Sequence, residues 1–236
     1  MSPFLPRSHP YRKHSENFRA VSAGLTQAER FHKEAIRRGD DPATEFAARV
    51  HHMMVGLMAE AALRKISTDP AGFNARERTL LGQERSQISR WKRAVEFAFR
   101  RHHAIPIHLE VDATTTNAAV AVQFATITSL LENDLAEVIE DRNKIAHAQW
   151  VWLLNNTETA FTGRAAPPLN YKAIDRRARM ITNIAHVIND LVVSERTFQR
   201  DFQQHYNAIL NLQQDLAGSD FPAFVAELRR SRRPIT

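Results

Sequence analysis

The stretch Asp41–Ile66, DPATEFAARVHHMMVGLMAEAALRKI, decides the fold class of this chain. Asp41 and Pro42 mark a helix start, because aspartate caps helix N-termini and proline is favoured at the first helical position. Apolar residues then recur every three or four positions, at Phe46, Val50, Met53, Leu57 and Ala61. The stretch therefore predicts a long helix that buries one face, with His51 and His52 at the edge of that face.

Similar patterns predict further helices along the chain. A turn at 68–72 precedes a helix over roughly 76–101, and another helix begins at 114–117. This later helix either stops at Asn133-Asp134 or continues through it. Residues 174–217 contain neither glycine nor proline and form one long helix or two joined by a bend. Bundle packing explains their apolar face, and a coiled-coil dimer is the alternative.

Two short segments favour extended structure. Apolar residues alternate with other residues at Ile105, Ile107, Leu109 and Val111, which is typical of a strand. Residues near 150–163 have the pattern of a small β-hairpin. The sequence therefore predicts an all-α fold with a small β-hairpin insertion.

The termini differ from the centre in composition. Residues 1–40 are predicted to be a basic arm, because Pro3, Pro6 and Pro10 oppose an early helix, with a short helix over 26–38. Residues 41–217 form the helical domain. Residues 218–236 form a basic tail, since the arginines at its end are typical of a solvated segment.

The overall composition is that of an ordinary globular protein with a basic surface. Hydrophobic residues make up 43% of the 236 positions, charged residues make up 25%, and the formal net charge is +6. The calculated isoelectric point is about 10.0. A basic surface attracts polyanions such as RNA.

Cysteine is absent, which excludes disulfides, thiolate metal sites and cysteine nucleophiles. A chain without cysteine fits a reducing cytoplasm. No apolar run is long enough for a membrane span, and the N-terminal residues do not resemble a secretory signal. Histidines occur in close groups, but adjacent helical residues point about 100° apart and chelate poorly. We therefore expect a cytoplasmic protein that contacts no membrane and needs no metal or other cofactor.

The stretch that carries chemistry is Glu140–Trp150, EDRNKIAHAQW. Arg142 and His147 are five residues apart, or about 140° around an ideal helix, so they do not share a face. Asn143 and His147 do share one. A kink, or a second copy of the segment across a twofold axis, would bring all three together.

These three side chains suffice to cleave RNA without a metal ion. Histidine can move a proton from the ribose 2′-hydroxyl, which attacks the adjacent phosphorus. A guanidinium can hold the phosphate and offset the charge that develops on it. An asparagine amide can orient the histidine or bind the phosphate. DNA lacks the 2′-hydroxyl and is expected to resist this reaction.

The segment Arg142-Asn143-Lys144-Ile145-Ala146-His147 resembles the RNxxxH form of the Rx4–6H motif of the HEPN family of metal-independent ribonucleases. The resemblance covers roughly residues 41–216. It implies a bundle of four to five main helices, with Arg142 and His147 as the catalytic pair and Asn143 as the polar motif residue. It also implies a homodimer with a composite active site and products with 2′,3′-cyclic phosphate and 5′-hydroxyl ends.

Toxin–antitoxin pairs, phage defence and RNA processing are the settings that the resemblance implies, with a neutralising antitoxin or regulatory partner. Some toxin members carry a tyrosine two residues after the histidine, where the antitoxin adenylylates it. Gln149 stands at that position, so the resemblance does not extend to this regulation. Ala148 stands where glycine is frequent in the family, and it predicts a helix that continues through Trp150.

Other cations and one tryptophan are candidate RNA contacts: Lys144, Trp150, Arg176, Arg177 and Arg179. Trp150 could stack on a base, although packing is the commoner role of such a residue. The three arginines stand near the start of a helix, where they oppose its dipole, which favours a phosphate-binding surface. Two alternatives to the enzyme remain: a non-catalytic HEPN-fold module that binds RNA or protein, and an unrelated helical protein with a chance motif.

Overall fold

The computed structural model describes residues 5–155, 159–165, 169–218 and 220–231, which form a helical bundle with one two-stranded ribbon. This architecture confirms the all-α class. In chain order, the elements are α1 (Pro10–Arg38), α2 (Asp41–Thr68), α3 (Ala75–Gln83), α4 (Gln87–His102), α5 (Ala118–Leu130), η1 (Leu131–Leu135), α6 (Ala136–Ala146), β1 (Trp152–Leu154), β2 (Phe161–Ala165), α7 (Tyr171–Val193), α8 (Glu195–Thr197), η2 (Phe198–Phe202), α9 (Gln203–Gly218) and α10 (Phe221–Arg230). None of the helices in these residues has the length and apolar character to cross a membrane.

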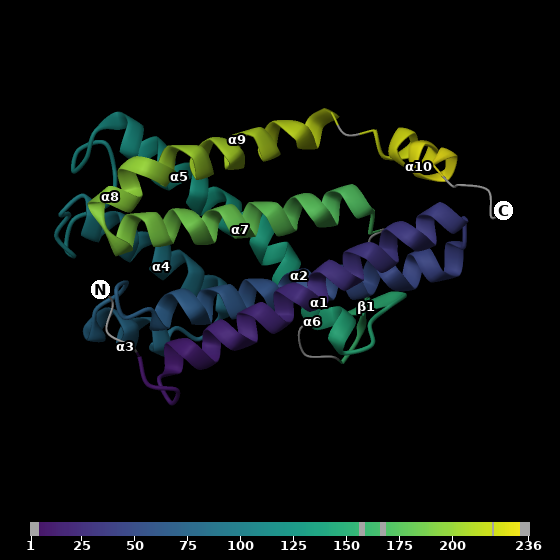
Figure 1. Cartoon of the computed structure of the whole chain (residues 1–236), viewed down its shortest axis with the longest axis horizontal. Coiled ribbons are helices and arrows are strands. Elements are labelled where there is room, and N and C mark those ends of the chain that lie inside the picture. Colours follow the sequence, from purple (N-terminus) through teal and green to yellow (C-terminus); the bar gives the residue numbers. More distant parts are fainter. Residues whose placement is uncertain (1–4, 156–158, 166–168, 219, 232–236) are drawn as a thin grey trace.

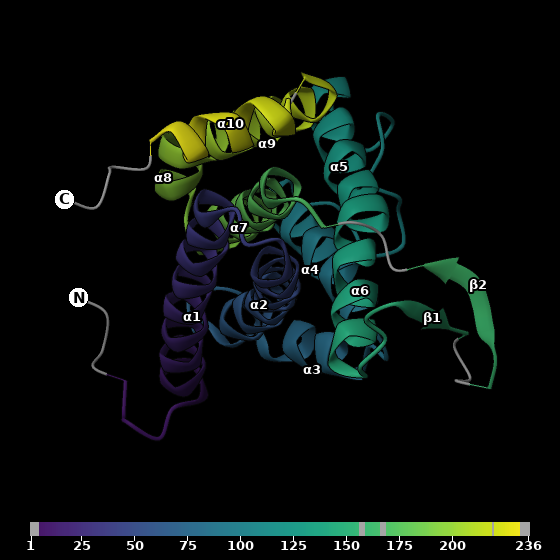
Figure 2. The ribbon, with the colours of Figure 1, turned by 90° about the vertical axis from the view of Figure 1, so that its right-hand side faces the viewer.

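Helix α2 occupies the centre of the bundle. It packs along α1 on one side and contacts α7, α6 and α4 on the others (Figures 1 and 2). Helix α9 covers the outer side of α7. The π-helical turn η1 joins α5 to α6 without a break, so the predicted helix continues through Asn133-Asp134. A residue on α6 is therefore positioned by contacts with the central helix α2.

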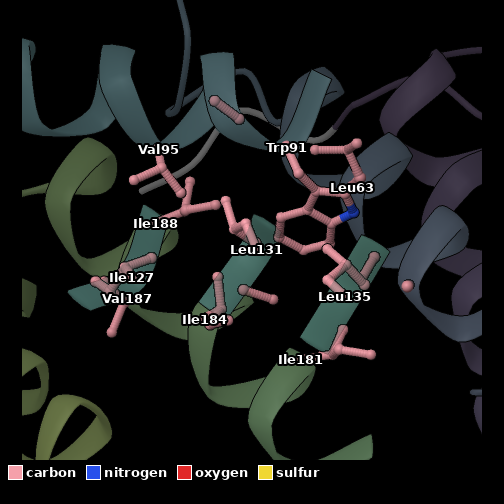
Figure 3. Close-up of a cluster of buried hydrophobic side chains, with 14 of the residues drawn as sticks. Leu63, Trp91, Val95, Ile127, Leu131, Leu135, Ile181, Ile184, Val187 and Ile188 are labelled. Carbon is pink, nitrogen blue, oxygen red and sulfur yellow. The ribbon is translucent and has the colours of Figure 1, made fainter. Parts of the chain in front are cut away.

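The main core lies between α2, α4, the α5–η1 segment and α7. Figure 3 shows the Trp91 ring among Leu63, Leu131 and Leu135, with isoleucines of α7 beside them. Trp91 has no solvent exposure, and its indole N–H has no hydrogen-bond partner among the described residues. Trp91 therefore stabilises the bundle through apolar packing alone.

The buried face of α2 differs from the predicted one. Asp40, rather than Asp41, caps the helix by accepting a hydrogen bond from the Ala43 backbone N–H. Phe46 is 47% exposed, whereas His51 and His52 are fully buried. The prediction was wrong because α2 is covered on several sides, so one apolar stripe does not define its buried surface.

Two predicted helical stretches are divided by local caps. The expected helix over 76–101 is split into α3 and α4, because Ser86 forms a capping box with Ser89. The stretch over 174–217, expected as one long helix or two joined by a bend, is divided where Ser194 caps α8 after the end of α7, which corresponds to the second expectation. Serine side chains that accept backbone N–H bonds favour a new helix start over continuation.

The predicted terminal segments are largely helical and packed. Helix α1 begins at Pro10 instead of residue 26, because proline is compatible with the first turn, and it buries Ala28, His32, Ala35 and Ile36. In the predicted tail, α10 lies against α1, and Phe224 stacks on Tyr171 with ring centroids 5.1 Å apart. Residues 1–4, 219 and 232–236 of these two segments lie outside the described residues.

The only strands among the described residues are β1 and β2, which pair antiparallel with Trp152 opposite Ala165 and Leu154 opposite Phe161. They project from the bundle beside α6 (Figure 2). Residues 156–158 of the expected hairpin lie outside the described part of the chain. The segment around Ile107 and Leu109 forms turns instead of the expected extended structure, and both side chains are exposed.

A pair of buried histidines joins α1 to α2. The His32 Nδ1 and His51 Nδ1 atoms lie 3.3 Å apart, so one ring donates a hydrogen bond and the other accepts it. Both rings pack against Tyr171, whose hydroxyl donates a hydrogen bond to Glu29 at 2.8 Å. Burial lowers the pKa of His32 and of His51 to about 4, because the charged forms lose their hydration.

Acidification is expected to weaken the α1–α2 contact. Each ring is neutral in the fold and binds a proton more readily when the chain is unfolded. The contribution of the two rings to the free energy of unfolding is therefore complete above pH ~6.5 and is lost as the pH falls towards ~4. Chemical unfolding at pH 7.5 and 4.5 should show that His32→Leu reduces the pH-dependent loss by on the order of 2 kcal/mol. The exposed control His108→Ala should keep the wild-type pH dependence. An equal pH dependence in wild type and His32→Leu would contradict this assignment.

Candidate active site

The predicted catalytic segment forms the last turns of α6, where α6 crosses α2. The contact is close because Gly56 of α2 has no side chain. A Cβ atom built on Gly56 would lie 2.7 Å from both Cβ and Cγ of Arg142. Glycine at this position therefore allows the stem of Arg142 to lie directly against the backbone of α2.

Gly56→Ala is expected to destabilise the protein, although alanine is normally the better helix former. The added methyl group would displace Arg142 and the end of α6, at a cost of about 1–3 kcal/mol. Gly82→Ala is the matched control, because Gly82 also lies in a helix but a Cβ there meets nothing within 4 Å. Urea unfolding should show a loss of stability for Gly56→Ala and a gain of up to ~1 kcal/mol for Gly82→Ala. A gain at both positions would contradict the close contact.

The Arg142 guanidinium is held between α2 and α4. Its Nη2 donates to Gln87 Oε1 at 3.1 Å and to Glu60 Oε2 at 3.4 Å. The side chain is 20% exposed, and its buried Nε has no hydrogen-bond partner among the described residues. The arrangement fixes the orientation of the guanidinium and leaves one N–H donor unsatisfied.

Asp141, the residue before Arg142, faces the other side of the contact with α2. Its Oδ2 atom lies 3.4 Å from Nε2 of His52, which has no solvent exposure. That separation is longer than an ordinary hydrogen bond. Neither of these two atoms has a hydrogen-bond partner among the described residues, so Asp141 lies beside the buried imidazole without a formed hydrogen bond.

His147 and Asn143 are exposed at the end of α6. The His147 backbone N–H donates to the Asn143 carbonyl at 3.0 Å, so the two residues lie on adjacent turns of the same helix end. Neither side chain has a hydrogen-bond partner among the described residues. Arg142 points between α2 and α4, and no hydrogen bond joins it to His147. Within one chain, the structure brings Asn143 close to His147 but does not pair Arg142 with His147.

The helix ends earlier than the sequence predicted. Ala146 is its last residue, and Ala148 has a φ of 59°, in the left-handed region. The Ala148 N–H donates to the Ile145 carbonyl at 3.1 Å and the Gln149 N–H to the Lys144 carbonyl at 2.9 Å, which is the Schellman pattern. The high helix propensity of Ala148 did not extend the helix to Trp150, because the tertiary contacts of Trp150 hold the chain in another direction just beyond this turn.

Ala148→Gly is expected to stabilise the protein, because glycine adopts a positive φ without the steric cost that alanine bears. The gain should be about 0.5–1 kcal/mol, measured by urea unfolding. Ala146→Gly is the control, since Ala146 is also exposed but is helical, and glycine there should cost up to ~1 kcal/mol. Destabilisation by Ala148→Gly would argue against the left-handed turn.

Trp150, a predicted RNA contact, braces the turn that follows His147. Its indole N–H donates to the Ile145 carbonyl at 2.9 Å, and its own carbonyl accepts a bond from Arg49 Nη2 at 2.9 Å. The guanidinium of Arg49 lies 5.3 Å from the centroid of the ring, and the Phe46 ring lies 5.9 Å away. Packing therefore occupies much of the Trp150 ring.

The four predicted RNA-binding cations all have acidic neighbours. Lys144 pairs with Glu140, Arg176 lies 4.0 Å from Asp134, Arg177 pairs with Glu137, and Arg179 pairs with Asp175 at 3.0 Å. Arg176 and Arg177 thus link α7 to η1 and α6, while Arg179 is the most exposed of the four side chains at 66%. The arginines that oppose the dipole of α7 are compensated by these carboxylates.

Three residues of the candidate site could not be selected from the motif: Gly56, Glu60 and Gln87. Gly56 carried a usable signal, because a lone glycine inside a long helix usually marks a close packing contact. Glu60 and Gln87 lie 82 and 55 residues before Arg142 and carry no local pattern. Among the described residues, no group of three or more histidine, aspartate or glutamate side chains is arranged to hold a metal ion.

Comparison with known proteins yields no match: no family model, no curated protein and no solved structure resembles the chain closely enough to be matched.

Proposed function

We propose that this protein is a metal-independent endoribonuclease of the HEPN type, with Arg142 and His147 as the catalytic pair and Asn143 as the polar motif residue. The observation that carries the proposal is that one helix end holds a pre-oriented Arg142, fixed between α2 and α4, and an exposed His147 and Asn143 without side-chain partners among the described residues. An arginine fixed by Gln87 and Glu60 loses little freedom on binding phosphate.

The reaction proceeds by internal attack on phosphorus. His147 removes the proton from the ribose 2′-hydroxyl, the 2′-oxygen bonds to phosphorus, and the bond from phosphorus to the 5′-oxygen breaks. The 5′-oxygen takes a proton from a protonated imidazole, which leaves 2′,3′-cyclic phosphate and 5′-hydroxyl ends. Arg142 stabilises the charge on the phosphoryl oxygens. No metal ion is required in these steps.

A second copy of the chain completes the site in this proposal. Arg142 and His147 do not meet within one chain, and a twofold axis near the end of α6 would place the two motifs together. Large apolar side chains are exposed close to that end of the molecule, at Phe31, Phe46, Val151, Trp152 and Phe161. Apolar residues in such number near one end support a protein interface, and hence a homodimer.

The cellular role proposed is that of a toxin or phage-defence effector in the cytoplasm. An unrestrained ribonuclease harms the cell that makes it, so a neutralising antitoxin or regulatory partner is expected. Expression of the wild type alone should arrest growth, while His147→Ala should not. Equal growth with both forms would contradict the toxin role.

The substrate class is tested with RNA and DNA of the same sequence. The purified protein, in EDTA, should cleave single-stranded RNA and leave the DNA intact, because only RNA carries the attacking 2′-hydroxyl. RNA with 2′-O-methyl groups should also resist cleavage. Cleavage of DNA, or activity that appears only with added divalent cations, would contradict the proposed mechanism.

A non-catalytic module that binds RNA or protein is the second candidate. The ion pair between Arg142 and Glu60 favours it, because a guanidinium already neutralised by a carboxylate offsets less of the charge that develops on phosphorus during cleavage. This function predicts that the protein binds RNA without cleaving it, and that Glu60→Gln tightens the binding.

A further inference from the structure

One carboxylate on α2 holds two arginines. Oε1 of Glu60 accepts hydrogen bonds from Nε and Nη2 of Arg64, at 3.1 and 2.6 Å. Its other oxygen, Oε2, accepts from Nη2 of Arg142 at 3.4 Å. Glu60 and Arg64 are four residues apart on α2, and such pairs are common on helix surfaces. Arg142 comes from another helix, α6, so two cations share a single anion here.

Neither guanidinium is saturated by these contacts. The Nη1 groups of Arg64 and Arg142 have no hydrogen-bond partner among the described residues. Nη1 of Arg142 is not among the buried unpartnered atoms, and the Arg64 side chain is 52% exposed. Each Nη1 group carries two N–H donors. Both arginines therefore keep donors that an anion from solvent can reach.

The neighbouring acidic groups do not balance these two arginines. Glu60 supplies one negative charge for two positive charges. Asp141, which precedes Arg142 in the sequence, lies beside His52 on the other side of the contact with α2. Gln87, the remaining partner of Arg142, is neutral. A surface with an excess of positive charge attracts anions.

The two arginines lie along the seam between α2 and α6. Arg49 of α2 donates to the Trp150 carbonyl, just beyond the end of α6. Further along α2, Gly56 lies against Arg142, and Arg64 follows about two turns later. The seam therefore leads from the proposed catalytic end of α6, past Arg142, to Arg64.

A phosphodiester backbone is the anion that suits this seam. Guanidinium N–H groups bind phosphate oxygens strongly, and a chain with a net charge of +6 attracts polyanions. One carboxylate spans both arginines, so they are close enough to hold successive phosphates. We propose that Arg64 binds the phosphate of single-stranded RNA that neighbours the phosphate held by Arg142. This role of Arg64 rests on the proposed function, which supplies the RNA and the role of Arg142.

The test measures binding of a labelled 2′-O-methyl RNA, which resists cleavage, by fluorescence anisotropy from about 50 to about 200 mM salt. Arg64→Gln should weaken binding by about tenfold, because it removes charge-assisted hydrogen bonds to phosphate. The slope of log affinity against log salt should become shallower by about 0.7, which corresponds to one single-strand phosphate.

The matched control is Arg200→Gln. Arg200 also donates through Nε and Nη2 to a carboxylate, that of Asp201, and it is exposed in η2, away from α6. Its loss changes the net charge by the same amount as Arg64→Gln, so it should leave the salt slope unchanged. Both variants should unfold at a temperature close to that of the wild type.

Cleavable RNA supplies a second readout. Arg64 touches no reacting atom, so Arg64→Gln should raise KM by a similar factor and leave kcat within about twofold of the wild type. If the wild type binds RNA without cleaving it while Arg64→Gln still weakens binding, the ribonuclease is rejected and the phosphate contact of Arg64 stands.

Three results would overturn the role of Arg64. One is the absence of RNA binding by the folded wild type. Another is an affinity and a salt slope that are equal in the wild type and Arg64→Gln. The third is an equal loss in Arg64→Gln and Arg200→Gln, which would indicate attraction by the net charge alone.

Discussion

His147→Ala is expected to reduce the rate of RNA cleavage by about 100- to 10,000-fold, which is the usual contribution of a general acid or base. The side chain is exposed and has no hydrogen-bond partner among the described residues, so its removal should leave stability within about 0.5 kcal/mol of the wild type. Cleavage of a fluorescently labelled RNA and thermal unfolding, measured on the same preparation, separate the two effects.

The matched control is His108→Ala, because His108 is equally exposed but lies in the loop between α4 and α5. It should cleave RNA at the wild-type rate. His147→Ala that retains full activity would remove His147 from the mechanism. Equal loss in both variants would indicate a general effect of removing surface imidazoles.

Trp91→Ala is expected to destabilise the protein by about 3–5 kcal/mol, the typical cost of truncating a buried tryptophan. Trp91 has no solvent exposure and packs between α2, α4, η1 and α7, so the cavity would adjoin four elements at once (Figure 3). Urea unfolding followed by circular dichroism measures the loss.

Val122→Ala is the control at an exposed apolar position outside the proposed interface. Val122 lies in α5 and is 61% exposed, so its truncation should change stability by no more than about 0.5 kcal/mol. A small effect of Trp91→Ala would mean that the bundle repacks around the missing ring, contrary to the core described.

The predictable part of the fold depended on local signals. Asp41-Pro42 marked the start of α2 to within one residue, because capping preferences act within a single turn. The same signals were present at Ser86, where a helix that looked continuous is broken, and at Ser194, where the bend left open by the sequence occurs. Local rules could therefore place these boundaries, provided that the N-capping preference of serine is weighted above the helical spacing of the apolar residues on either side.

The unpredictable part depended on contacts between distant residues. His51 and His52 are buried because α1 and α6 cover them: His51 contacts His32 of α1, and His52 lies 3.4 Å from Asp141 of α6, and no local pattern relates these residues. Phe46 is 47% exposed, because its ring is covered only in part by Phe31 of α1 and Trp150. In the candidate site, the motif residues could be identified from the sequence, whereas the partners of Arg142 could be identified only from the three-dimensional structure.

The most direct measurement of the central claim is the chemical nature of the RNA ends that the dialysed wild-type protein produces in EDTA. Cleavage through Arg142 and His147 should leave 2′,3′-cyclic phosphates and 5′-hydroxyls, which accept labelled phosphate from a polynucleotide kinase directly. Ends that bear 5′-phosphate, or RNA that stays intact in the presence of a verified dimer, would contradict the proposed ribonuclease.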